Sequence, residues 1–480
     1  MTYLSVILAY LFALIAIGIV KSRKIHTQSD FALAGRALTP WVLVGTMLAS
    51  WIGTGSILGN AGKTYETGMA ALMLPIGSIL GIILLTRIAG KVRSYEKYTV
   101  PEIIGDRYGP VARNLSVIAL VMAYMVIVSY QYNAGGAVLY TILADNTGTS
   151  IISIELATII AAVFIIAYTM LAGLLSVAYT DAANSIIMTL ALVISLPILW
   201  IKAGSWSGME TAFAAMNKSQ HMQFGGVYST MDIINFCLPP FLLVIGDANM
   251  YQRFSASKDV QSARYSTTIL VFAVLFIELL IIASAWVSSS MIPEAEVGKH
   301  VLIYAAHQFL PTFLGAIMLT TIVGIIISTA DSFLLVPANT LIRDIYLNYI
   351  NPQASEKNIV RLSRLLVLLL GIIAYIVSIG FSRSAGFFER ALYAYTIYGA
   401  AITPALVAAL FWRGATKEGA VASIICGTLV TLFWKELPGL WFWLPTEWYI
   451  SLDEVLPAIS GSLLALICVS YLTQKADPGK

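Results

Sequence analysis

Charged side chains are scarce in this chain: Asp, Glu, Lys and Arg make up 11% of its 480 residues, whereas apolar residues make up 59%. A soluble protein of this length needs a polar surface that such a composition cannot supply. Stretches of about 20 apolar residues recur along the chain, and each could cross the hydrocarbon core of a membrane as a helix. No stretch shows the alternating pattern of a membrane barrel. Since helices satisfy their own backbone hydrogen bonds in lipid, we predict an all-α integral membrane protein.

Cysteine and histidine are also rare, with three and four copies. The cysteines lie in apolar runs, where they are expected to pack as small side chains, and the histidines fall in loops or at span ends. The sequence contains no metal-ligand spacing, phosphate-binding loop or Gly-x-Ser-x-Gly elbow. These absences argue against an enzyme and against a nucleotide-driven pump.

Thirteen candidate spans follow one another along the chain. Their ranges are 3–20, 40–62, 68–90, 112–143, 151–171, 175–201, 231–252, 263–291, 311–345, 362–381, 388–412, 417–437 and 453–473. If the N-terminus lies outside, about three quarters of the 28 Lys and Arg residues fall on the cytoplasmic side, as the positive-inside rule requires. We therefore predict a multi-pass protein of the cell (plasma) membrane, with its N-terminus outside and its C-terminus in the cytoplasm.

Two spans carry residues that weaken a helix. The 40–62 span contains Gly53 and Gly55 among hydroxyl side chains, and the 231–252 span contains Pro239 and Pro240, which we expect to break the helix. Glycines that allow close packing and prolines that only kink a helix are the alternative interpretation. However, the two spans are five apart, and interrupted helices at equivalent positions of two halves indicate an inverted-repeat transporter.

This pattern predicts one transporter domain over residues 1–480, divided into four parts. An extra N-terminal span (3–37) precedes the first repeat (40–201), and the second repeat (231–412) precedes two C-terminal spans (417–473).

Polar groups also occur at membrane depth, where they are costly and usually functional. Asp181 lies in the sixth span, and Ser328, Asp331 and Ser332 lie in the ninth at i, i+3 and i+4, on one helical face. Such oxygen ligands suit a small hard cation. Hydroxyls that bond to the preceding turn and an Asp that caps a helix are the structural alternative. Two further acidic residues, Asp247 and Glu278, receive no role.

Four segments in order resemble the sodium:solute symporter family: 41–68, 178–181, 246–258 and 328–346. The resemblance covers nearly the whole chain. It implies a LeuT-type fold of five plus five inverted spans, with one extra span in front, and a sodium-coupled symporter.

The resemblance also implies the binding residues. One sodium site would use the carbonyls of Ala49, Ile52 and Ile325 and the hydroxyls of Ser328 and Thr329. A second sodium site, or a proton site, would use Asp181, Ser328, Asp331 and Ser332. The solute would lie between the two breaks, near Trp51, Gly53, Ser56, Tyr130, Gln131, Pro240, Leu243, Tyr393 and Thr396.

The break of the seventh span offers apolar side chains, whereas a sugar needs several hydrogen-bond partners. We therefore favour an amino acid or another small zwitterion or carboxylate, carried with Na⁺ by alternating access. Lipid, sodium and the solute are the expected partners; no nucleic acid and no obligate protein partner is expected. Three alternatives remain open, namely a proton-coupled carrier of the same fold, a sodium-coupled sugar transporter and a membrane solute sensor.

Overall fold

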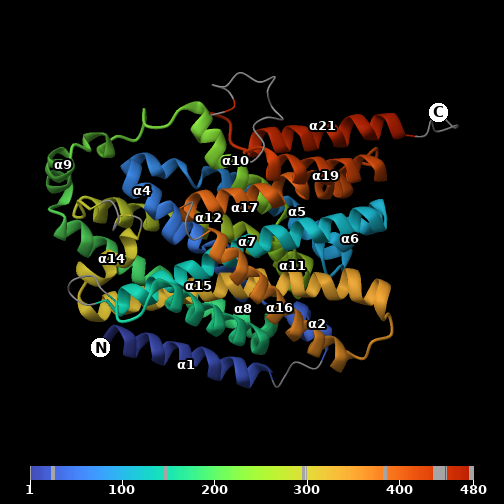
Figure 1. Ribbon diagram of the computed structural model, residues 1–480, viewed down its shortest axis with the longest axis horizontal. Helices are drawn as coiled ribbons and strands as arrows, with labels where there is room; N and C mark the ends of the chain where they lie inside the picture. The colour runs from blue at the N-terminus through green and yellow to red at the C-terminus, as the bar shows by residue number, and fades with distance from the viewer. Residues whose placement is uncertain are drawn as a thin grey trace.

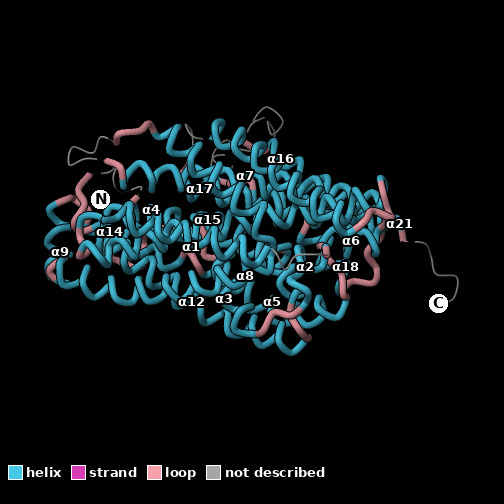
Figure 2. Tube along the Cα trace, turned by 90° about the horizontal axis from the view of Figure 1, so that it is seen from below, coloured by secondary structure: helices cyan, strands magenta, loops and turns pink. Residues whose placement is uncertain are grey.

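The computed structural model describes residues 2–22, 27–144, 150–294, 298, 300–381, 386–435, 449 and 451–474. In these residues helices dominate, and β-structure is limited to two isolated bridges. The long helices run along the longest axis of the molecule, so that it resembles a bundle in both views (Figures 1 and 2). The first helix begins near one end of that axis and the last helix ends near the other (Figure 1).

The first half of the chain contains helices α1 to α9. They are α1 (Thr2–Ser22), α2 (Gln28–Leu33), α3 (Pro40–Trp51), α4 (Ala61–Thr67), α5 (Ile76–Tyr95), α6 (Val100–Tyr108), α7 (Pro110–Ile142), α8 (Ile154–Lys202) and α9 (Ser205–Ala215), with the π-helix η2 (Gly55–Asn60) and the 3₁₀ segments η1 (Ala34–Arg36) and η3 (Gly68–Met73).

The second half contains the remaining helices. They are η4 (Ser219–Met222), α10 (Thr230–Gly246), α11 (Ala248–Ala256), α12 (Val260–Ser289), α14 (Val301–Gln308), α15 (Thr312–Thr340), η5 (Leu341–Ile350), α16 (Glu356–Phe381), α17 (Phe387–Ala401), α18 (Thr403–Phe411), α19 (Lys417–Phe433) and α21 (Val455–Thr473).

In the described residues, each of the thirteen predicted spans falls largely on helical structure. Among the described residues nine helices are long and apolar enough to cross a membrane, and ten if the bent pair at 40–73 forms one span. The other three predicted spans correspond to α1, α5 and α19, which are shorter or more charged. The number thirteen therefore remains a prediction.

Local sequence signals explain many helix ends. Thr27 with Asp30 and Ser229 with Asp232 form capping boxes at the starts of α2 and α10. The predicted boundary between the fifth and sixth spans is confirmed, because α8 is interrupted at Gly173, whose φ of 58° suits glycine.

The predicted break in the second span is confirmed. Helix α3 ends at Trp51, the chain continues as η2 from Gly55, and the two parts meet at an angle of 51°. Because Ile52 has a ψ of 87°, the backbone between the two parts is not helical.

The predicted position of the second break is wrong. Helix α10 continues through Pro239 and Pro240 and ends only at Gly246, before Asp247 with its ψ of 112°. The fixed φ of proline is itself helical, so tight packing can carry a helix through it. Gly77 of α5 provides this packing, since a Cβ atom there would lie 1.9 Å from the Cys237 carbonyl oxygen. Instead, the carboxylate of Asp247 accepts the N–H of Asn249 and starts α11.

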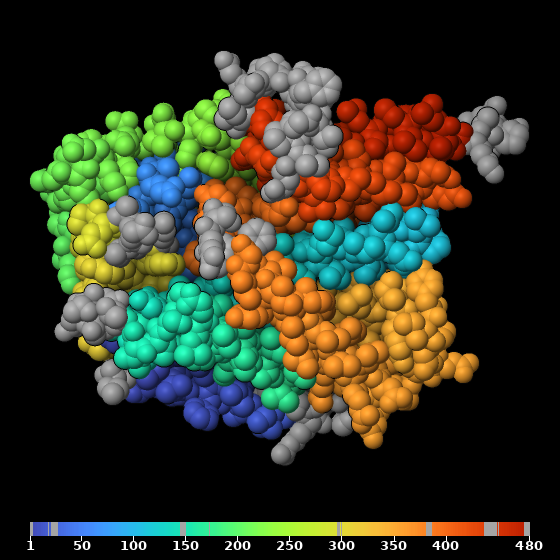
Figure 3. Space-filling view, viewed as in Figure 1, coloured from blue at the N-terminus to red at the C-terminus, as the bar shows by residue number. Residues whose placement is uncertain are grey.

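Helix α15 forms the centre of the bundle. It is the most deeply buried of the long apolar helices, and it contacts α7, α8, α3 and α1. Helices α19 and α21 pack side by side along one edge of the molecule (Figure 3). This arrangement places the polar residues of α15 deep inside the protein.

Candidate functional site

The first break lies against α15. In a continuous helix, the N–H groups of Gly53 and Ser56 would bond to the carbonyls of Ala49 and Ile52. Here Gly53 N bonds to Trp51 O at 3.0 Å and Ser56 N bonds to Gly53 O at 3.1 Å. Two of the three carbonyls predicted to bind sodium, those of Ala49 and Ile52, have therefore lost their helical partners.

Thr329 closes the other side of this break. Its hydroxyl donates to the Ala49 carbonyl at 3.4 Å, and a Cβ atom on Gly53 would lie 3.0 Å from its side chain. Ser328 and Thr329 are both 2% exposed, and Ile325 precedes them by one helical turn. The Ala49 carbonyl and the Thr329 hydroxyl thus meet in one buried place, and oxygen atoms of these two kinds are ligands that small monovalent cations accept.

Asp181 on α8 lies at the centre of a polar cluster next to the first break. Its carboxylate accepts hydrogen bonds from Ser328 Oγ at 2.5 Å and from Thr46 Oγ1 at 2.6 Å. The guanidinium of Arg253 lies 3.5 Å from the same carboxylate, and both side chains are almost completely buried. A buried carboxylate is therefore satisfied by two hydroxyls and one cation.

Arg253 was missed as a site residue, because its sequence position suggested a basic loop on the cytoplasmic side. It lies on α11 and is fully buried. Its guanidinium donates to Ser332 Oγ at 2.7 Å and to Thr46 Oγ1 at 3.1 Å, so it connects the second half of the chain to α3 and α15. The sequence did contain a signal for this burial. Arg253 follows Asp247 by only six residues, and a short helix that starts at membrane depth keeps its side chains inside the protein.

The residues expected at the second ion site are distributed over two places. Asp181 and Ser328 share a hydrogen bond, and Ser332 joins them through Arg253. Asp331 accepts its hydrogen bond from Thr169 on the first part of α8 instead.

A small cavity lies beside the first break. It has a volume of about 40 Å³, close to the share of one water molecule in the liquid. Its described lining includes three of the predicted solute residues, Trp51, Ser56 and Pro240, together with Gly55, Asn60, Leu74, Pro75, Ser78, Phe236, Glu278, Phe388, Ala391, Leu392 and Tyr395.

Helix α17 presents a different face to this cavity from the expected one. Phe388 and Tyr395 line it, whereas Tyr393 and Thr396 lie outside its described lining. The hydroxyl of Thr396 donates to the Leu392 carbonyl of its own helix. Leu243 is buried against α17, where a Cβ atom on Gly399 would lie 3.2 Å from its nitrogen.

The predicted residues of α7 are buried next to the break. Gln131 accepts a hydrogen bond from Thr54, and its Nε2 atom has no hydrogen-bond partner among the described residues. Tyr130 is 1% exposed. Gln131 therefore keeps a buried donor available beside the site.

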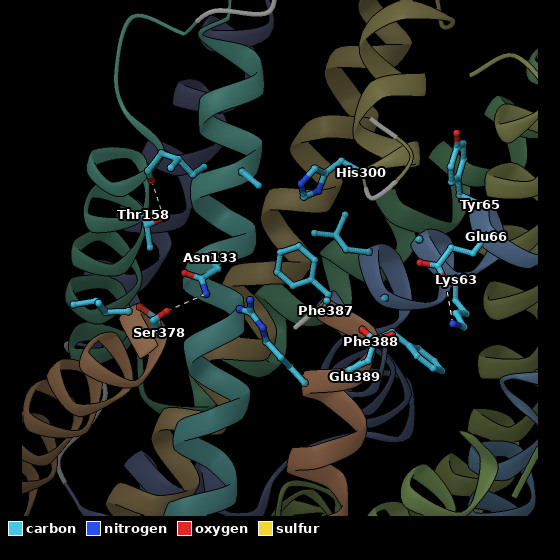
Figure 4. Close-up of a pocket in the computed structure, with 18 of the residues that line it drawn as sticks. Lys63, Tyr65, Glu66, Asn133, Thr158, His300, Ser378, Phe387, Phe388 and Glu389 are labelled. Atoms are coloured by element: carbon cyan, nitrogen blue, oxygen red, sulfur yellow. Dashed lines mark hydrogen bonds and ion pairs between the residues drawn. The ribbon is translucent and has the colours of Figure 1, made fainter. Parts of the chain in front are cut away.

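A larger cavity of about 900 Å³ adjoins the small one, and Figure 4 shows its lining. Its walls come from η2, α4, α7, α8, α16 and α17 and from His300, which directly precedes α14. In the close-up His300 and Phe387 lie between Asn133 on one side and Glu66 on the other (Figure 4). Phe388 lines both cavities, so its ring lies on the boundary between them.

A helix broken inside an apolar bundle, with carbonyls that have lost their helical partners and a hydroxyl across the gap, is typical of membrane transporters. In transporters of this class, ions and solutes bind at such breaks.

The family follows from comparison with known proteins. The family model "Sodium:solute symporter family" matches residues 31–427, and the chain belongs to this family. It is 26% identical to the sodium/proline symporter of Haemophilus influenzae over 98% of this chain and 94% of the relative. It is 25% identical to the osmoregulated proline transporter OpuE of Bacillus subtilis over 97% and 94%.

Solved structures show the same fold. A Na⁺-coupled sialic acid symporter in a substrate-bound outward-open state superposes with a TM-score of 0.82, at 15% identity, over 99% of this chain and 98% of that one. The nucleobase-cation symporter Mhp1 superposes with a TM-score of 0.58, at 11% identity, over 93% and 95%. The chain therefore has the LeuT-type fold and is a sodium-coupled solute symporter of the plasma membrane, not an enzyme.

Proposed function

We propose that this protein imports a small amino acid or a related zwitterion together with Na⁺, and that the ion binds at the break of α3. The proposed ligands are the carbonyls of Ala49, Ile52 and Ile325 and the hydroxyls of Ser328 and Thr329. One observation carries the proposal: Ala49 and Ile52 lose their helical hydrogen bonds where Thr329 lies across the gap. The broken helix presents bare carbonyl oxygens without exposing them to lipid.

The side chains that line the small cavity favour an amino acid over a sugar. Trp51 and Tyr395 stack with ring centroids 6.3 Å apart, and Phe236 and Phe388 add further aromatic faces. The polar side chains of the lining already bond to one another or to the backbone, so they leave few partners for several sugar hydroxyls; they are Ser56, Asn60, Ser78 and Glu278. The relatives named as proline symporters and transporters support a solute of this size. Because the cavity is smaller than any amino acid, its walls must move to admit one.

We propose that one sodium drives transport and that Asp181 is already neutralised by Arg253. A second cation among Asp181, Ser328, Asp331 and Ser332 would lie close to the guanidinium and be repelled by it. A proton is the alternative for this second set. Asp331 is the candidate for it, since it has no ion pair among the described residues.

The proposed orientation has the N-terminus outside and the C-terminus inside. Basic residues of the connections gather at the end of the bundle opposite the start of α1, where Arg113 pairs with Asp106 at 3.0 Å and Arg343 lies 3.8 Å from Glu102. In this orientation the larger cavity, of about 900 Å³, opens to the outside. The repeats at 40–201 and 231–412, with 3–37 and 417–473 outside them, remain part of this proposal.

In the proposed mechanism, alternating access couples the sodium gradient to the uptake of the solute. External sodium binds better to the outward-facing state, because equal affinity for both states would shift no population. A potential near 100 mV adds about 2.3 kcal/mol for each charge that moves inwards.

Uptake of labelled L-proline into proteoliposomes tests this function. We expect accumulation with an inward sodium gradient and none with potassium in its place. Accumulation driven by a pH gradient without sodium would replace the proposal by the proton-coupled carrier. Sodium-driven uptake of glucose but not of amino acids would favour the sugar transporter. If purified protein binds solutes but carries none, it is a sensor.

A further inference from the structure

Glu278 is the most unusual group that the sodium site does not use. It lies on α12 at membrane depth, is 2% exposed, and lines the small cavity beside the first break. Burying an ionised carboxylate in a membrane protein is costly unless a cation or several donors compensate.

The partners of Glu278 are neutral. Ser56 Oγ donates to Oε1 at 2.6 Å, and Asn60 Nδ2 donates to Oε2 at 3.0 Å. Both donors lie on η2, directly after the break. No Lys, Arg or His of the described chain pairs with this carboxylate, in contrast to Asp181, which has Arg253. The site therefore holds an acidic side chain that has no basic partner among the described residues.

The surrounding rings are suited to a cation. Trp51, Tyr395, Phe236 and Phe388 line the same cavity, and aromatic faces attract ammonium groups. Lys63 demonstrates this attraction nearby, because its ammonium lies 5.6 Å from the ring of Phe236 and 5.9 Å from that of Phe388. Lys63 is itself paired with Glu66 at 2.8 Å, so it is already matched.

From this arrangement we propose that Glu278 binds the ammonium group of the solute. Ser56 and Asn60 orient its carboxylate, and the aromatic rings cover the rest of the cation. The solute class is therefore an amino or imino acid whose nitrogen is protonated, which excludes neutral sugars and simple carboxylates. This inference rests on the proposed amino acid symport and names the group that selects the solute.

An isosteric pair of solutes tests the inference on the unaltered protein. Tetrahydrofuran-2-carboxylate has the ring and carboxylate of L-proline but an ether oxygen in place of the NH₂⁺ group. We expect it to compete with labelled L-proline at least 30-fold more weakly than unlabelled L-proline does, as expected for loss of one charged hydrogen bond. Equal competition would overturn the inference, even though sodium-driven proline uptake would still support the proposed function.

The variant Glu278→Gln tests the same point from the protein side, since it keeps the shape and removes the charge. We expect it to lose proline affinity and to discriminate between the two competitors by less than about threefold. Thermal stabilisation by sodium should remain, which shows that the variant is folded. Glu210→Gln, on the exposed helix α9, is the matched control and should keep the discrimination of the unaltered protein. A Glu278→Gln protein that discriminates as strongly as this control would overturn the inference.

Absence of any amino acid uptake by the unaltered protein, with sodium stabilisation intact, would contradict the proposed solute class and with it the role of Glu278. Proline uptake with unchanged discrimination in Glu278→Gln would contradict the role of Glu278 alone.

Discussion

The two helix breaks of this transporter occupy matching places in the chain, yet their chemistry differs. At the first break the carbonyls of Ala49 and Ile52 have lost their helical partners, and only a 3.4 Å contact from Thr329 reaches one of them. At the second break, the carbonyls accept hydrogen bonds from tyrosine hydroxyls of the protein. Tyr251 donates to Ile245 O at 3.0 Å, and Tyr398 donates to Gly246 O at 2.8 Å.

This difference shows how a repeated architecture can be used for two purposes. The first break keeps oxygen atoms for an ion. At the second break the protein's own side chains satisfy the polar groups. Tyr124 donates to the Asp247 carboxylate at 2.6 Å, and Thr403 donates to the Leu242 carbonyl at 2.8 Å. Since satisfied polar groups resist opening, we expect the second break to act as a rigid joint and the first as the binding element.

The largest effect is expected where the two halves are connected. Arg253→Met removes the buried guanidinium and leaves Asp181 unpaired, which costs about 3–5 kcal/mol of stability. The melting temperature of the purified protein should fall strongly, and uptake should be lost.

The double variant Asp181→Asn/Arg253→Met is the control, because it removes both charges. It should recover part of the lost melting temperature. If Arg253→Met alone is as stable as the unaltered protein, Arg253 does not connect the two breaks.

At the second break, Tyr398→Phe removes the hydroxyl that satisfies the Gly246 carbonyl. Leaving that buried carbonyl unpaired costs about 1–3 kcal/mol. The melting temperature should fall, while the sodium concentration for half-maximal uptake stays the same. A large change in sodium dependence would mean that the second break also binds the ion.

At the first break, Thr329→Ala should change the sodium dependence of uptake and leave the melting temperature nearly unchanged. Loss of one ligand to a charged group corresponds to roughly tenfold weaker sodium binding. The sodium concentration for half-maximal uptake should rise by that factor, with little change in melting temperature without sodium. Ser328→Ala should raise it as well, and unchanged sodium dependence in both variants would refute the assigned ligands.

The smallest effect lies outside both breaks, at His221 of η4. Burial, helped by the neighbouring Lys218, lowers the pKa of this imidazole to about 4. The folded protein keeps His221 neutral, while the unfolded chain takes up a proton below about pH 6.5. Stability is therefore lost as the pH falls from about 6.5 towards 4.

Melting curves at pH 7.5 and pH 4.5 measure this effect. We expect His221→Gln to lose about 1–3 °C less than the unaltered protein between the two values. Sodium dependence of uptake at pH 7.5 should be identical in both, because the residue lies away from the breaks.

Much of the site could be predicted from the sequence, because its signals are local. Glycines in an apolar span indicated the first break, and hydroxyls at helical spacing indicated the facing side of α15. The position of the second break could not be predicted in this way. Packing of Gly77 on Cys237 keeps α10 helical through both prolines, and this contact joins distant parts of the chain.

Arg253 and Glu278 show a second limit of prediction from the sequence, namely that it does not give the partners of buried charged side chains. The positive-inside rule assigns Lys and Arg by their place between spans, so it treats a buried Arg as a loop residue. The acidic partner of Arg253 lies on α8 and the donors to Glu278 lie on η2, and neither pairing follows from sequence spacing.

Direct binding of ²²Na⁺ to the purified protein, without solute, tests the central claim. We predict saturable binding of one ion per chain, weakened about tenfold or more by Thr329→Ala and unchanged by Tyr398→Phe. Equal affinity of the Thr329→Ala and unaltered proteins would contradict sodium binding at the first break.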